Sequence, residues 1–496
     1  MFAAYSVAEI RRAEEATGDA LASGSLMQRA AAGLAAVLLD ELRRPGVEGL
    51  PPSRGVRGRS VLLAVGSGNN GGDALWAGVR LLRRGVRVVA WRTASTVHAE
   101  GWAAFVAAGG REVDAVGALA ALPDQDLVVD GVLGIGGRGG LRGPAGVFAD
   151  ACVDSGARVV AVDLPSGLDA DSPGLAASFV ADVTVTFGGR KACQVLEPAA
   201  SRCGRVVVVD IGLDLGEPML TCWTASDVAA HYPWPGATSD KYGRGAVGLD
   251  TGSDTYPGAA VLSAMGAVYG GVGFVRYVGP ARDAVVAALP NVVTAPGRVQ
   301  AWLLGCGWGA RPDGASLVEA RLAERLPTVL DADALVHVRG ARLRDTVLRD
   351  AVLAECVLLT PHAGELAALL GVDRASVEAD PLVHARAAAA STGATVMLKG
   401  ATQYVVEPAG RVTIAVGGPA WTAQAGSGDT LAGLCAAMLA AGRSAREAAL
   451  LGASMQAITA RNFPGPRPPQ DLARLVADVI PTLEVPGGNL GRCQSR

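Results

Sequence analysis

Short apolar segments alternate with alanine-rich, arginine-containing segments along most of the 496 residues. Most of the apolar segments are continuous, a pattern typical of parallel strands buried on both faces of a sheet. This alternation predicts a doubly wound α/β sheet in the first half of the chain and a further α/β domain in the second half. The predicted strands are Val61–Val65, Val86–Ala90, Leu127–Asp130, Arg158–Asp163, Val183–Phe187, Val206–Asp210, Ala301–Leu304, Thr328–Leu330, Cys356–Leu359, Thr395–Leu398, Tyr404–Glu407 and Val412–Val416.

One segment interrupts the alternation near the middle of the chain. Leu213–Gly245 contains prolines and two tryptophans but no long periodic stretch, so we interpret it as a linker with a boundary near residue 225. The predicted organisation is a Rossmann-like three-layer domain over residues 1–225, a second α/β domain over residues 226–486 and a disordered tail over residues 487–496. Val7–Leu39 is predicted to form one or two amphipathic helices.

The composition argues against several classes of partner. A net charge of −3 does not favour nucleic acid or an anionic membrane surface. No apolar segment reaches the length of a bilayer span, and the N-terminus lacks the basic and apolar regions of a signal peptide. The eight cysteines show no metal-ligand or disulfide spacing. We therefore expect a cytoplasmic protein without nucleic-acid or membrane partners.

Polar side chains gather where three predicted strands of the first half end. Asn70 follows the first strand, Asp130 ends the third, and Asp163 and Ser166 lie at the end of the fourth. Ligands of open α/β sheets bind beyond the carboxyl ends of the strands, so we expect these four side chains to lie close together.

The loops at these strand ends are rich in glycine. Gly66–Gly71 and Gly134–Gly139 each fit a loose G-x-G-x-x-G pattern, in which backbone N–H groups bind phosphate. The acidic residue that binds ribose in a standard dehydrogenase domain is missing after the second strand. Structural turns alone also explain glycine, but they explain Asn69, Asn70 and Asp73 less well. Side-chain oxygens of these residues suit a hard cation, and a monovalent ion there would anchor a phosphate-bearing ligand.

Five segments of the first half resemble the NAD(P)H-hydrate epimerases. They are SLMQRAA (25–31), NNGGD (69–73), DGVLGIGGRG (130–139), AVDLPSGLDAD (161–171) and TFGGRKACQV (186–195), and the resemblance covers residues 1–215. It implies that Asn70, Asp130 and Ser166 bind potassium, and we expect Asp163 to be catalytic. Ala74 departs from the family pattern, which usually has glycine there. The residues implied to contact the hydrated nicotinamide nucleotide are Asn69, Asn70, Gly71, Gly72, Asp73, Gly134, Ile135, Gly136, Gly137, Arg138, Gly139, Gly140 and Asp163.

The sharpest motif of the second half is QAGSGDTLAG (424–433), in which small residues precede Asp429 and a helical pattern. N–H groups at such a helix start stabilise the negative charge that develops during phosphoryl transfer. Asp429 is placed to take a proton from an acceptor hydroxyl. No Walker A sequence is present, so this is not a P-loop enzyme. The alternative is a glycine-rich helix start at which Asp429 is only a first-turn charge.

Further candidate site residues follow other predicted strands of the second half. Asp331 and Asp333 suit Mg²⁺ or substrate, and His362 follows the next strand. Lys399 follows another strand. Lys399 and Lys191 are two of only three lysines in the chain, which indicates places where a compact ammonium is preferred to arginine.

These residues occur in the order typical of the ribokinase-like superfamily, and residues 238–480 resemble its ADP-dependent NAD(P)H-hydrate dehydratases. TYPGAAVLSAMGAVYGGVGFV (255–275) and LLGCGWG (303–309) are further matching segments. The resemblance implies a ribokinase-like α/β domain that uses ADP and Mg²⁺. SDKYGRG (239–245), Cys306 and Trp308 depart from the family pattern. Ala259, Gly307, His362 and Asp429 are implied to contact the hydrated cofactor, and Lys399, Gly400, Ala401, Thr402, Gln403 and Gly428 the adenine nucleotide.

Together the two halves predict repair of NADH or NADPH that water has damaged at C6 (NADHX and NADPHX). The first domain, with K⁺, interconverts the R and S hydrates. The second phosphorylates the S hydrate with ADP and eliminates phosphate, which leaves AMP and the restored cofactor. We also expect a homo-oligomer. Two alternatives stay open: a vitamin or sugar kinase with an accessory first domain, and a first half that only binds or scaffolds. The residues favour neither ADP over ATP nor NADH over NADPH.

Overall fold

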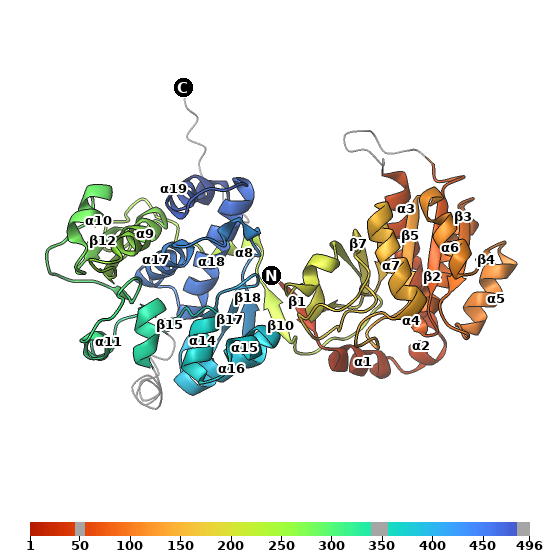
Figure 1. The fold of residues 1–496 in the computed structure, drawn as a ribbon, viewed down its shortest axis with the longest axis horizontal. Coiled ribbons are helices and arrows are strands. Elements are labelled where there is room, and N and C mark those ends of the chain that lie inside the picture. The colour runs from red at the N-terminus through yellow and green to blue at the C-terminus, as the bar shows by residue number, and fades with distance from the viewer. Residues whose placement is uncertain (45–54, 339–355, 484–496) are drawn as a thin grey trace, which may run out of the picture. The chain divides into compact units, whose positions relative to one another are not determined.

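The computed structural model describes residues 1–44, 55–338 and 356–483 (Figure 1). The chain divides into two compact units. The N-terminal unit is Ala3–Met219, and the C-terminal unit is Leu220–Arg496 together with Met1–Phe2. No helix within the three described ranges is long and apolar enough to cross a membrane. The expected tail, residues 487–496, lies outside the described residues.

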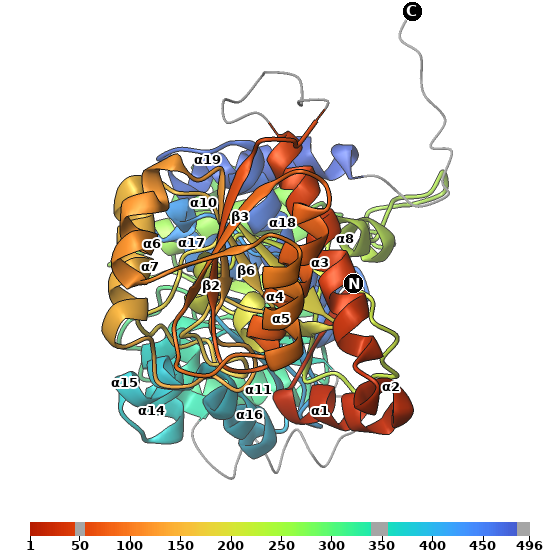
Figure 2. The same ribbon diagram turned by 90° about the vertical axis from the view of Figure 1, so that its right-hand side faces the viewer.

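The N-terminal unit is built on a parallel sheet with helices on both faces (Figure 2). In spatial order its strands are β4 (Arg111–Val113), β3 (Arg87–Arg92), β2 (Ser60–Val65), β5 (Leu127–Gly131), β6 (Val159–Val162), β7 (Val183–Phe187) and β9 (Arg205–Val209). One face is covered by α3 (Ser25–Arg43), α4 (Asn69–Leu82) and α5 (Ala99–Ala107), and the other by α6 (Ala115–Ala121) and α7 (Gly143–Ser155). Along β2, Leu63 packs in the first apolar layer and its neighbours Leu62 and Ala64 in the second. The predicted three-layer α/β fold is confirmed.

All six strands predicted for the first half are confirmed, and their bounds differ by at most two residues. The structure adds β4 and a parallel pair, β1 (Phe2–Tyr5) with β8 (Arg190–Lys191). These strands have four residues or fewer, too few to carry a pattern. The helical prediction for Val7–Leu39 corresponds to α1 (Val7–Ala16), α2 (Asp19–Ala22) and α3, which are separated where Gly18 and Gly24 adopt positive φ.

The C-terminal unit contains a mixed sheet. In spatial order its strands are β12 (Phe274–Tyr277), β11 (Ala246–Asp250), β13 (Ala301–Leu304), β14 (Thr328–Leu330), β15 (Val357–Leu359), β16 (Thr395–Leu398), β17 (Tyr404–Val406), β18 (Val412–Ile414) and β10 (Leu220–Cys222). The strands from β12 to β16 run parallel, whereas β17 is antiparallel to both of its neighbours. All six strands predicted for the second half are confirmed, and the unit is α/β as expected.

The interpretation of Leu213–Gly245 as a linker is wrong in part. This segment contains β10 and α8 (Ala225–His231), and Val228 of α8 is fully buried in the core of the C-terminal unit. β11 and β12 were also not predicted. Gly248 weakens the strand pattern of β11, but the ring of Trp302 packs so closely there that a Cβ at Gly248 would lie 2.3 Å from it.

Two helices cross at very short range in the core of the C-terminal unit. They are α9 (Pro257–Tyr269) and α17 (Ser427–Ala440). A Cβ at Gly266 of α9 would lie 2.1 Å from the carbonyl oxygen of Thr430, and a Cβ at Gly433 of α17 would lie 2.1 Å from that of Ser263. Glycine on both helices therefore permits the backbone contact that positions the start of α17.

Candidate functional site

A pocket of about 410 Å³ lies in the N-terminal unit, beyond the carboxyl ends of β2, β5 and β6. Its wall includes Asn69, Asn70, Asp73, Asp163 and the segment Gly134–Gly137. The structure therefore brings together most of the residues implied to contact the hydrated nucleotide. The predicted contact residues that do not line the pocket, all within the described ranges, are Gly71, Gly72, Arg138, Gly139 and Gly140.

The glycine-rich stretch after β2 is a helix start rather than a loop. α4 begins at Asn69, directly after its N-cap Gly68. A Cβ at Gly71 would lie 2.3 Å from the carbonyl oxygen of Gly66, and a Cβ at Gly66 would lie 1.9 Å from that of Val132. These glycines therefore permit close backbone approach and do not serve a left-handed turn. The free N–H groups of the first helical turn favour an anion such as a phosphate.

Asp130 and Ser166 form a buried polar cluster behind this pocket. Asp130 accepts hydrogen bonds from the Ser166 N–H at 2.7 Å and from the Ser166 hydroxyl at 2.5 Å. Burial raises the pKa of Asp130 to about 7. Asn70 lies beside the same cluster, because a Cβ at Gly134 would be 3.0 Å from Asn70 Oδ1. A buried carboxylate whose recorded donors are neutral, next to hydroxyl and amide oxygens, fits a monovalent cation.

Asp163 lies directly after β6 in an unusual conformation. Its φ is 65°, in the left-handed region that residues other than glycine rarely adopt. Lys191 Nζ lies 2.5 Å from Asp163 Oδ1 and 2.8 Å from Thr186 Oγ1, and the lysine is only 1% exposed. Gln194 donates to the carbonyl oxygen of Asp163 at 2.6 Å. A strained residue fixed by a buried ion pair at a pocket is typical of a functional site.

The sequence pattern gave no role to several residues that line this pocket, among them Lys191 and Glu14. Lys191 was notable for the scarcity of lysine, but its pairing with Asp163 follows from the fold. Glu14 of α1 also lines the pocket, and nothing in the sequence pattern indicated it. Burial raises the pKa of Asp73 well above its usual value, and the charges of Asp163 and Glu14 raise it further. Burial and the charge of Asp163 likewise raise the pKa of Glu14.

Asp331 is the centre of a polar cluster in the C-terminal unit. It follows β14 and is 1% exposed. Lys399 Nζ and Thr360 Oγ1 each lie 2.6 Å from Asp331 Oδ1, and Cys306 Sγ lies 3.3 Å from Asp331 Oδ2. Glu365 Oε2 lies 4.0 Å from Lys399 Nζ. The ends of four neighbouring strands, β13 to β16, therefore supply one cluster.

Asp429, in the first turn of α17, joins this cluster. The ligand atoms of Cys306, Asp331 and Asp429 all lie within 4.8 Å of one another. Burial, and then the charge of Asp331, raise the pKa of Asp429 to about 7. The two carboxylates fit Mg²⁺, which prefers oxygen ligands, whereas the thiol is a soft ligand that does not favour it.

Several other predicted residues lie around Lys399. His362 forms a parallel β-bridge with Lys399 and caps α14 (Ala363–Leu370), where its Nδ1 accepts from the Glu365 N–H at 3.1 Å. A Cβ at Gly428 would lie 3.3 Å from Lys399 Nζ. Gly400–Gln403 form the connection from β16 to β17 directly after Lys399.

Ala259 and Gly307 contact each other. Gly307 has a φ of 62°, and a Cβ there would lie 2.5 Å from Ala259 Cβ. The structure records no hydrogen bond or ion pair that joins these two residues to Lys399 or Asp429 within the described ranges, so their place in the same site stays a prediction.

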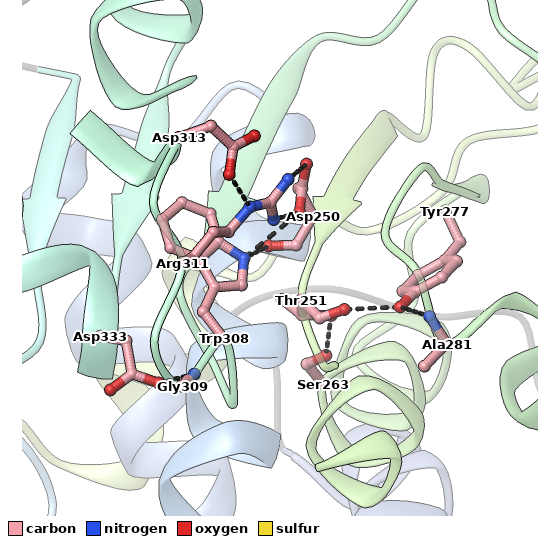
Figure 3. A network of polar contacts seen from close by, with 10 residues as sticks. All are labelled: Asp250, Thr251, Ser263, Tyr277, Ala281, Trp308, Gly309, Arg311, Asp313 and Asp333. Atoms are coloured by element: carbon pink, nitrogen blue, oxygen red, sulfur yellow. Dashed lines mark hydrogen bonds and ion pairs between the residues drawn. The ribbon is translucent and has the colours of Figure 1, made fainter. Parts of the chain in front are cut away.

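A polar network fixes the segment that follows Gly307 (Figure 3). Trp308 Nε1 donates to the carbonyl oxygen of Asp250 at 2.9 Å, and the Gly309 N–H donates to Asp333 Oδ2 at 2.7 Å. Arg311 pairs with the Asp250 carboxylate and lies 4.7 Å from the centre of the Trp308 ring. Trp308 departs from the family pattern, yet it holds this segment in place. Asp333, predicted for Mg²⁺ or substrate, anchors the loop.

Two family models match the chain. The model described as NAD(P)H-hydrate dehydratase matches residues 247–482, and that described as YjeF-related protein N-terminus matches residues 23–193. A crystal structure of the ADP/ATP-dependent NAD(P)H-hydrate dehydratase from Bacillus subtilis, co-crystallised with ATP and Mg²⁺, covers 53% of this chain and 99% of its own, with 24% identity and a TM-score of 0.48.

Relatives match the chain over nearly its whole length. A protein of Mycobacterium leprae (strain TN) named bifunctional NAD(P)H-hydrate repair enzyme is 43% identical over 494 residues, which cover 97% of this chain and 98% of the relative. A protein of the same name from Mycobacterium tuberculosis (strain CDC 1551 / Oshkosh) is 44% identical over 455 residues and covers 90% of each chain. The chain belongs to the family of bifunctional NAD(P)H-hydrate repair enzymes.

Proposed function

We propose that the N-terminal unit interconverts the R and S hydrates of NADH and NADPH, and that the C-terminal unit dehydrates the S hydrate at the expense of ADP. The observation that carries this proposal is the match to relatives named for hydrate repair across 97% of the chain, which includes both carboxylate clusters. A kinase with an accessory domain accounts less well for an intact Asp130–Ser166 cluster and Asp163–Lys191 pair in the first unit.

In the C-terminal unit, Asp429 is the proposed base. It takes the proton of the C6 hydroxyl while that oxygen attacks the terminal phosphoryl group of ADP, which leaves AMP. The start of α17 and the ammonium of Lys399 stabilise the charge on the transferred group. The C6–O bond then breaks and phosphate leaves, because phosphate is a far better leaving group than hydroxide. C5 gives up a proton to water, and the C5–H electrons form the C5=C6 double bond. Mg²⁺, held by Asp331, would supply charge neutralisation on the phosphates and leave Asp429 free to act as the base.

The proposed binding of the adenine nucleotide involves Lys399–Gln403 and Gly428, and that of the hydrated cofactor involves Ala259, Gly307 and His362. The proximity of Gly428 to Lys399 Nζ supports a nucleotide phosphate at this place. Potassium bound by Asn70, Asp130 and Ser166 would fix the loop after β5 against the phosphate-bearing substrate.

We also infer a reducing compartment such as the cytoplasm, supported by the fact that no cysteine in the described ranges forms a disulfide. Homo-oligomeric assembly stays a prediction, which light scattering on the purified protein would test.

One assay tests the proposed function. Purified protein is mixed with the separated R and S hydrates of NADPH, with ADP or ATP, and recovery of nicotinamide absorbance and release of phosphate are followed. Recovery from both hydrates, with one phosphate released for each cofactor restored, is the expected result. A stable phosphorylated product would instead identify a kinase, and recovery from the S hydrate alone would leave the N-terminal unit without the proposed activity.

A further inference from the structure

Three carboxyl groups line the pocket of the N-terminal unit, and their surroundings differ. Asp163 is in contact with the ammonium of Lys191. Glu14 is half-buried on α1, and Asp73 lies one turn into α4. The assignment of an acid and a base in such a site follows from the groups that surround each carboxyl.

Asp163 is held in a buried ion pair at the pocket. Lys191 lies 2.5 Å from Asp163 Oδ1, and Thr186 Oγ1 lies 3.2 Å from the same atom. The ion pair and the strained backbone hold the Asp163 carboxyl in one orientation in the pocket wall, where it is placed to accept a proton.

The surroundings of Asp73 differ from those of Asp163. The residue is 7% exposed, and its buried Oδ1 has no hydrogen-bond partner although it belongs to the pocket wall. Burial raises the pKa of Asp73 well above its usual value, with Asp163 and Glu14 as further causes. The other charged or titratable groups that line this pocket and the adjoining one are Arg11, His98, Glu100 and Lys191.

We propose that Asp73 is the general acid and Asp163 the general base of an epimerisation that breaks and re-forms the C6–O bond. This inference rests on the proposed epimerase function. It assigns a proton-transfer role to Asp73, which lines the same pocket as the Asp163–Lys191 pair and whose buried Oδ1 has no hydrogen-bond partner.

The proposed epimerisation has two steps, the loss of water from C6 and its re-addition, and their atoms and electrons balance. Asp73 gives its proton to the C6 hydroxyl, the C6–O bond breaks, and water leaves while the ring nitrogen lone pair forms an N1=C6 double bond. A water on the opposite face then adds its oxygen to C6 and gives a proton to Asp163, and the double-bond electrons return to N1. One hydroxyl is lost and one is gained, with no redox partner. The proton returns from Asp163 to Asp73 when the next molecule reacts in the reverse direction or by exchange through half-buried Glu14.

The first experiment compares isosteric variants in the full-length protein. Asp73→Asn keeps the shape of the side chain but has no acid proton, so the R-to-S kcat should fall by about 10²–10⁴-fold. Binding of the hydrate, measured by calorimetry, should change little, which also shows that the pocket is folded. Glu112→Gln, which removes an exposed carboxyl from β4 of the same sheet, should match the unchanged protein.

Glu14→Gln tests whether Glu14, rather than Asp73, is the general acid. If Asp73 is the donor, Glu14→Gln slows epimerisation less than Asp73→Asn does. The reverse order, or full activity of Asp73→Asn, overturns the assignment. If the unchanged protein does not interconvert the hydrates at all, the proposed function fails rather than the role of Asp73.

The second experiment needs no variant. Epimerisation of the R hydrate is run briefly in water labelled with a heavy oxygen isotope, and the S product is analysed by mass spectrometry. Cleavage of the C6–O bond requires one labelled oxygen in each S molecule formed. Retention of the original oxygen overturns the proposal, because Asp73 would then have no leaving hydroxyl to protonate.

Discussion

At the scale of single residues, the proposed role of Asp429 as the base predicts that the dehydration rate depends on pH. A base acts only when deprotonated, and burial together with Asp331 raises the pKa of Asp429 to about 7. We therefore expect kcat for the S hydrate at saturating ADP to rise with pH through about 7 and to level off above it. Asp429→Asn should lower kcat by about 10²–10⁴-fold with little change in ADP binding. A pH profile that is flat across this range, or a variant with near-normal turnover, would exclude Asp429 as the base.

Asp163 is proposed to be catalytic, and it is also the ion-pair partner of the buried Lys191. Its replacement by alanine leaves the buried ammonium of Lys191 without its partner, which costs about 3–5 kcal/mol of unfolding free energy. Asp163→Ala should thus abolish R-to-S conversion and destabilise the N-terminal unit, while dehydration of the pure S hydrate persists. Combined with Lys191→Met, it should regain stability in urea titrations but not epimerisation. Equal loss of both enzymatic activities in Asp163→Ala would contradict separate roles for the two units.

Asn70 is expected to link the cation to the substrate. Its Nδ2 atom is buried without a hydrogen-bond partner, and Oδ1 lies beside Gly134. Asn70→Ala removes one of the proposed oxygen ligands, so activation of epimerisation by potassium should require a higher salt concentration and the hydrate should bind more weakly. Titration with KCl against LiCl measures this effect. An unchanged potassium dependence would make Asn70 a structural residue of the helix start.

At the scale of elements, continuous apolar strands could be predicted from the sequence. The contacts that each strand makes with other segments of the fold could not. β13, β14 and β16 have their predicted bounds because their residues are buried on both faces. β11 was missed because Gly248 leaves its side-chain space to Trp302 from the neighbouring strand. The motifs located Asp163 and Asp331 at strand ends, whereas their pairing with Lys191 and Lys399 depends on how the fold brings together segments that are 28 and 68 residues apart in the chain.

The crossing of α9 and α17 offers a test at this scale. A Cβ at Gly266 would meet the backbone of Thr430, which cannot rotate away, so Gly266→Ala must displace the start of α17 that carries Asp429. We expect a loss of about 1–3 kcal/mol in stability and a lower dehydration rate, without loss of epimerisation. Gly258→Ala on the same helix meets no atom within 4 Å and is the matched control for stability. Equal stability of the two variants in denaturant titrations would show that α9 and α17 move apart without any loss in the free energy of unfolding.

At the scale of the whole molecule, each unit has its own core and its own carboxylate cluster. A product released by one unit should therefore serve the other unit of a different molecule. Neither Asp163→Ala nor Asp429→Asn alone should repair the R hydrate efficiently. We expect a mixture of the two variants to restore this repair. Nicotinamide absorbance with excess ADP measures this recovery against each variant alone. If the mixture stays inactive although each variant keeps its remaining activity, the S hydrate does not pass through solvent.

Because both units lie on one chain, the two catalytic units are produced in a fixed one-to-one ratio. Each round of translation produces one copy of each, so no difference in gene expression can leave a cell with surplus of either. The balance between the two reactions then depends only on their turnover numbers and on substrate levels. A mutation that slows one unit cannot be offset by making more of that unit alone, and selection must adjust rates rather than amounts.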